Sequence, residues 1–100
     1  MRKIKLDVPL HFTLGAHKIN VTVLPESDHE KAGVWIQEEN SIRLYPKGRS
    51  YEYMMQTFFH ELVHAILDVW ARPEDSGNED LVDAMSQGIM QFTKTAKYDG

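Results

Sequence analysis

The stretch from His60 to His64 reads His-Glu-Leu-Val-His, and this H-E-x-x-H pattern constrains the chain more than any other feature. Two histidines four positions apart project from the same side of an α-helix, where both imidazoles can reach one metal ion. Glu61, directly after the first histidine, is placed to polarise a water molecule at that metal. The pattern therefore predicts a helix that carries two metal ligands and a general base, which is the chemistry of zinc-dependent hydrolysis.

The surrounding residues predict one long helix from about Tyr51 to Trp70, with Ser50 as its N-cap. At 100° per residue, His60 and His64 fall on a polar side, and Glu61 turns toward the same side. The opposite side is apolar and consists of Met55, Phe58, Phe59, Leu62, Ile66 and Val69. A buried face and a separate His/Glu face suit a metal-binding helix. The alternative is a solvated helix whose histidines have this spacing by coincidence.

A catalytic zinc site usually takes a third protein ligand, and a second helix from about Asn78 to Thr95 offers carboxylates for that role. Its apolar residues recur at helical spacing after the break at Arg72–Gly77, and they are Leu81, Val82, Met85, Ile89 and Phe92. A helical hairpin that buries both apolar faces would bring Glu79 beside the histidines. Asp80 and Asp83 compete for this role, and an acidic first turn that only complements the helix dipole is the remaining alternative.

The two segments together resemble the gluzincin metallopeptidases, whose signature is H-E-x-x-H followed by N-E-x-x-S-D on the next helix. Here the second motif reads N-E-x-x-V-D from Asn78 to Asp83, so Val82 replaces the serine of the family pattern. The resemblance covers about residues 50–92, and its nearest layout is that of small bacterial and phage metallopeptidases of the ImmA/IrrE type. It implies a minimal zincin-like domain in which His60, His64 and Glu79 bind Zn²⁺. It further implies Glu61 as the general base and Asp83 as the acceptor that orients a ligand histidine.

The N-terminal half predicts β-strands, because polar and apolar residues alternate from Lys3 to Val8 and again from His17 to Leu24. The segments 33–37 and 42–45 flank a polar turn and predict a hairpin that leads into the metal helix. The expected fold is therefore α+β, with a small twisted sheet packed on a C-terminal helix pair. In metallopeptidases of this layout an edge strand binds the substrate backbone, and the hairpin from Gly33 to Tyr45 is the candidate for both that role and ordinary sheet structure.

The chain has 100 residues, no cysteine and a formal net charge of −4, which fits one domain over residues 1–100 with neither disulfides nor thiolate ligands. We expect no nucleic-acid partner, because Lys and Arg form no run, and no membrane segment. The polar start, without the character of a signal peptide, predicts a cytoplasmic protein. The partner predicted for the site is a peptide or protein substrate, and a regulatory protein partner stays open.

The remaining histidines, His11, His17 and His29, are expected on the surface and not as ligands. Tyr53, Tyr98 and His29 are candidates for stabilising an oxyanion, and the sequence selects none of them. Two other functions stay open beside a zinc peptidase. One is a catalytically silent zinc-binding module with a regulatory role, and the other is a packing protein that binds no metal.

Overall fold

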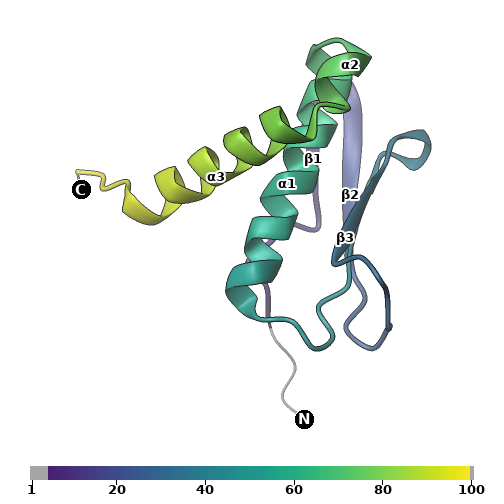
Figure 1. Cartoon of the computed structure of the whole chain (residues 1–100), viewed down its shortest axis with the longest axis vertical. Helices are drawn as coiled ribbons and strands as arrows, with labels where there is room; N and C mark the ends of the chain where they lie inside the picture. The colour runs from purple at the N-terminus through teal and green to yellow at the C-terminus, as the bar shows by residue number, and fades with distance from the viewer. Residues whose placement is uncertain (1–4, 100) are drawn as a thin grey trace.

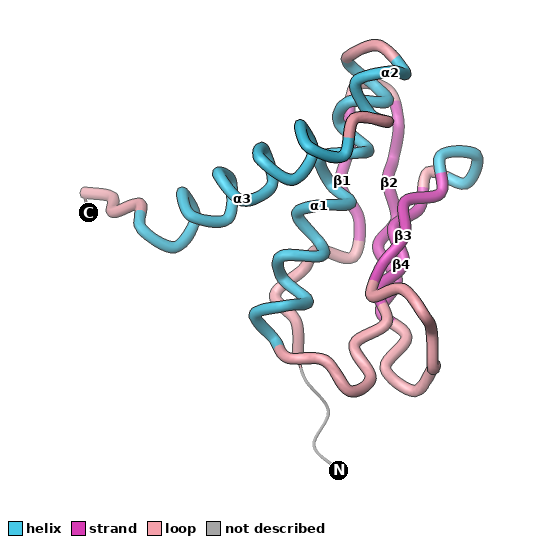
Figure 2. Tube along the Cα trace, in the orientation of Figure 1, coloured by secondary structure: helices cyan, strands magenta, loops and turns pink. Residues whose placement is uncertain are grey.

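The computed structural model describes residues 5–99, in which the helices lie on one side of a four-stranded sheet (Figures 1 and 2). The strands are β1 (His11–Leu14), β2 (His17–Val23), β3 (Gly33–Ile36) and β4 (Ser41–Leu44), and their order in the sheet is β1-β2-β4-β3. β2 and β4 are parallel, whereas β1 pairs with β2 and β3 pairs with β4 in antiparallel fashion. The predicted α+β layout is confirmed, and β3 forms one edge of the sheet.

The predicted strand from Lys3 to Val8 is wrong over its described part, because residues 5–8 form no strand, and Lys3 and Ile4 lie outside the described residues. Leu6 and Val8 nevertheless pack against the main core, which explains their alternation with polar residues. The strand forms later, at β1, where Phe12 pairs with Ile19 across a turn at Gly15. The alternation of polar and apolar residues indicates which side chains are half-buried, but it does not indicate which segment pairs with another strand.

Helix α1 (Tyr51–Trp70) has the predicted bounds, and the Ser50 side chain accepts a hydrogen bond from the main-chain N–H of Tyr53, as an N-cap does. Its sheet-facing side buries Met54 and Phe58 against the strand residues Ile19, Val21, Ile42 and Leu44. The expectation of a single apolar face is incomplete, because α1 also buries Val63 and Leu67 on the side of the two histidines. The face of α1 that carries His60 and His64 is therefore also its contact surface with the next long helix.

That helix, α3 (Glu79–Thr95), begins after its N-cap Asn78, whose side chain accepts from the main-chain N–H of Leu81. The predicted break contains a short helix, α2 (Pro73–Ser76), which the sequence analysis missed. Val82 of α3 is fully buried against Val63 and Leu67. The expected burial of the whole apolar stripe is wrong, because α3 diverges from α1 toward its C-terminal end and leaves Phe92 exposed (Figure 1). Among residues 5–99, no helix has the length and apolar character needed to cross a membrane.

Candidate metal centre

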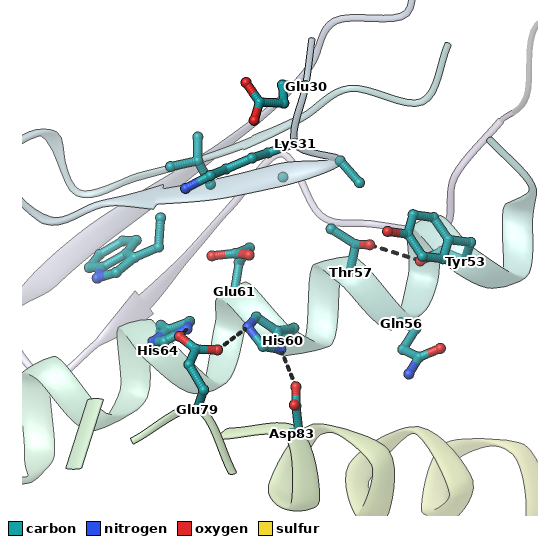
Figure 3. Close-up of a pocket in the computed structure, with 14 residues that line it drawn as sticks. Glu30, Lys31, Tyr53, Gln56, Thr57, His60, Glu61, His64, Glu79 and Asp83 are labelled. Atoms are coloured by element: carbon teal, nitrogen blue, oxygen red, sulfur yellow. Dashed lines mark hydrogen bonds and ion pairs between the residues drawn. The ribbon is translucent and has the colours of Figure 1, made fainter. Parts of the chain in front are cut away.

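The first turn of α3 brings the side chain of Glu79 against the two histidines of α1 (Figure 3). Its Oε2 lies 3.2 Å from His60 Nε2, and its Oε1 lies 3.2 Å from His64 Nε2. One donor atom from each of these three residues lies within 4.8 Å of the other two, so the group could hold a metal ion. Asp80, one of the predicted competitors of Glu79, is not a member of this group among the described residues. The buried contact of Val82 with Val63 and Leu67 sets this approach of the two helices.

Both histidines are oriented by a contact at the ring nitrogen that faces away from Glu79. Asp83 Oδ1 lies 3.0 Å from His60 Nδ1, which is the arrangement that the family resemblance implied for Asp83. Ser76 Oγ lies 3.3 Å from His64 Nδ1 and donates to the main-chain carbonyl of His64 at 3.3 Å. A proton on each Nδ1 leaves each Nε2 lone pair available for a metal. Sequence reasoning missed Ser76, because nothing in the turn after α1 indicates that it folds back on His64.

Glu61 lies beside this group on α1, and its carboxylate accepts a hydrogen bond from the main chain of Trp35 in β3. Burial raises the pKa of Glu61 above its usual value, and the nearby Glu79 acts in the same direction. His60, His64 and the Trp35 hydrogen bond act to lower this pKa. The Trp35 indole Nε1 donates to Asp68 Oδ2 at 2.6 Å, and this hydrogen bond joins β3 to α1. A carboxylate whose protonated form is favoured by burial is suited to accept a proton.

A pocket of about 730 Å³ lies between β3 and α1 and contains the His/Glu group on its floor (Figure 3). Its lining includes Gly33, Val34 and Trp35 of β3 and Ala32 directly before that strand. The Ala32 carbonyl accepts a hydrogen bond from the main-chain N–H of Tyr45, so the main-chain groups of Ala32 point toward the β4 side of the sheet. Because this direction alternates along a strand, the main-chain groups of Gly33 and Trp35 point toward the opposite, free edge. The hairpin selected from sequence therefore supplies an edge strand that borders the candidate metal centre.

The other predicted candidates lie outside the metal group or at the pocket's far end. His11, His17 and His29 are exposed, as expected, and none belongs to the metal group found among residues 5–99. The His29 ring instead stacks on Tyr45 with centroids 4.0 Å apart. Tyr98 is exposed on the segment after α3. Tyr53 lines the pocket, but Figure 3 shows it at the end opposite Glu79 and His64.

Comparisons with protein-family models, with curated proteins and with solved structures find no match for this chain. The function of this protein is therefore inferred from the geometry of the site and from its two motifs.

Proposed function

We propose that this protein is a zinc-dependent peptidase of the gluzincin type. The observation that supports this proposal most strongly is the convergence of His60 Nε2, His64 Nε2 and the Glu79 carboxylate beside Glu61. A structural zinc site is usually closed by four protein ligands, whereas a catalytic site has three and an open position. Three donors next to a partly buried carboxylate match the catalytic pattern.

The chemistry of the donor set fits Zn²⁺. In a tetrahedral zinc site with bonds of about 2.0–2.1 Å, neighbouring ligand atoms lie about 3.3 Å apart. Each Nε2 lies 3.2 Å from a different oxygen of Glu79, and one donor atom from each of the three residues lies within 4.8 Å of the other two, so the donors would draw closer together around a zinc ion. Imidazole and carboxylate are also the ligand types of known catalytic zinc sites. The contacts of Asp83 and Ser76 hold the two rings so that little reorganisation is needed when the metal binds.

In the proposed mechanism, bound zinc supplies a Lewis acid that polarises the scissile carbonyl and lowers the pKa of water. Glu61 takes a proton from the attacking water and delivers it to the leaving amine. The free edge of β3 binds the peptide backbone by main-chain hydrogen bonds, which aligns the scissile bond with Glu61.

The decisive experiment compares wild-type protein with Glu61→Gln and with the matched control Glu38→Gln. Glu38 is exposed in the turn between β3 and β4, so its substitution should leave both zinc content and hydrolysis unchanged. Glu61→Gln should retain one zinc per chain and lose at least about 100-fold in the rate of peptide hydrolysis, because general-base catalysis contributes about 10²–10⁴-fold. Equal rates for Glu61→Gln and wild type would rule out the mechanism.

Zinc content separates the proposal from its two alternatives. Wild-type protein that binds stoichiometric zinc but cleaves none of a diverse peptide library would be a silent zinc-binding module with a regulatory role. Protein that binds no zinc at neutral pH would be a metal-independent packing protein. His64→Ala should abolish stoichiometric zinc binding under either zinc hypothesis, since it removes one of the three converging donors.

A further inference from the structure

Among residues 5–99, Lys31 is the one lysine or arginine that lines the pocket, whose lining also includes the acidic residues Glu30, Glu61, Glu79 and Asp83. In Figure 3 its side chain extends along the pocket above Glu61, whereas the Glu30 carboxylate turns to the other side of the chain. Within residues 5–99 the Lys31 ammonium makes no ion pair, in contrast to Lys47 and Lys94. An unpaired cation over an acidic pocket is available to a negatively charged group of a ligand.

The main chain at Lys31 is held in place by a set of contacts on the outer side of the loop. Its N–H donates to His29 Nδ1 at 3.1 Å, and the His29 ring stacks on the buried Tyr45. The Arg49 guanidinium donates to the main-chain carbonyls of His29 and Glu30 at 3.0 and 3.2 Å, and to that of Tyr45 at 3.0 Å. This anchoring reduces the entropy that would be lost when the Lys31 ammonium binds a ligand.

The residues after Lys31 form the β3 wall of the pocket. Side chains alternate between the two faces of a strand, and positions 33 and 35 are on the face toward α1. A Cβ on Gly33 would meet Thr57 of α1, and the Trp35 indole donates to Asp68 of α1. Gly33 therefore lies close against Thr57, and both residues line the pocket. A peptide lying there would have Lys31 on one flank and Glu61 below it (Figure 3).

We propose that Lys31 is a specificity residue that binds a substrate carboxylate on the carboxyl-terminal side of the scissile bond. This inference rests on the proposed function, because it assigns the substrate chemistry of the same pocket. A peptide that pairs antiparallel with β3 runs opposite to it, so its carboxyl-terminal part lies beside the start of β3, where Lys31 is located. The carboxylate is either the free C-terminus of a short peptide or the side chain of Asp or Glu.

The test uses zinc-loaded Glu61→Gln protein, which binds peptides without cleaving them, and measures Kd by fluorescence anisotropy with labelled peptides. One pair of peptides differs only in a free or amidated C-terminus, and a second series exchanges Glu for Gln at each position on the carboxyl-terminal side. We expect the carboxylate form to bind about two- to fivefold more tightly in at least one arm, as an exposed ion pair provides. The arm that responds identifies the source of the carboxylate.

Adding Lys31→Met removes the charge but keeps an apolar stem, so it should abolish this preference and leave the Kd of the neutral peptide unchanged. Lys31→Glu should invert the preference toward peptides with Lys at the responsive position. Lys18→Met, at an exposed β2 position, is the matched control and should behave like its parent. Equal affinity for charged and neutral peptides, or a preference that survives Lys31→Met, would overturn the inference. The absence of hydrolysis in wild type would instead refute the proposed function, and the two failures are measured separately.

Discussion

Replacing Gly33 with alanine should destabilise the protein by pushing the edge strand away from α1. A Cβ at this position would lie 2.7 Å from Thr57 Cγ2, 3.1 Å from Leu44 Cδ2 and 3.3 Å from the Arg43 carbonyl oxygen. The Thr57 side chain cannot readily rotate away from this Cβ, because its Oγ1 donates to the Tyr53 carbonyl at 2.9 Å and a β-branched side chain has few rotamers in a helix. The steric clash therefore lies between β3 and α1, beside the pocket that both elements line.

The magnitude follows from two opposing terms. Overpacking typically costs about 1–3 kcal/mol, and the reduced freedom of the unfolded chain offsets roughly 0.4–1 kcal/mol of that when Gly becomes Ala. Gly33→Ala should therefore lower the free energy of unfolding by roughly 1–2 kcal/mol. In a domain of this size, each kcal/mol lowers Tm by roughly 4–8 °C. Urea denaturation followed by circular dichroism measures the loss directly.

A double-mutant cycle with Thr57→Ser tests the stated cause. Serine keeps the hydroxyl that bonds the Tyr53 carbonyl but lacks the Cγ2 methyl that lies nearest to the new Cβ. Thr57→Ser alone should cost less than about 0.8 kcal/mol, since it removes one half-buried methyl group. Combined with Gly33→Ala, it should recover roughly 1 kcal/mol relative to the sum of the single changes. Additive effects within about 0.3 kcal/mol, or wild-type stability of Gly33→Ala, would refute the steric argument.

Three further predictions concern the helices and the metal. Ser50→Ala should cost about 1 kcal/mol in urea denaturation by removing the N-cap of α1, and an unchanged midpoint would contradict the role of this cap. Val82→Ala should cost roughly 1–3 kcal/mol because it opens a cavity between α1 and α3, and a smaller loss would show that the helices collapse around it. Asp83→Ala should weaken zinc binding about 10–100-fold in a chelator competition, whereas Asp80→Ala should not, and equal effects would refute orientation of His60 by Asp83.

Local signals predicted the helical half of the fold well. The bounds of α1 and its N-cap Ser50 follow from side chains that act within one turn of their own backbone, whereas Asn78, expected as the first residue of the second helix, is its N-cap. The paired segments that became β3 and β4 were also recognised, because a polar turn separates two apolar runs. The first strand was misplaced, since Leu6 and Val8 are half-buried by packing alone while their backbone has no strand partner in the described sheet.

For the site, local sequence determined that His60, Glu61 and His64 share one region of a single helix, because helical periodicity leaves no other arrangement. Only the tertiary structure decided that Glu79 reaches both histidines, since this depends on how Val82 packs between Val63 and Leu67. The approach of Ser76 to His64, of Trp35 to Glu61 and of Lys31 to the pocket was likewise decided by tertiary folding. These contacts join residues distant in the chain, and no periodicity in a sequence encodes the distance between separate elements.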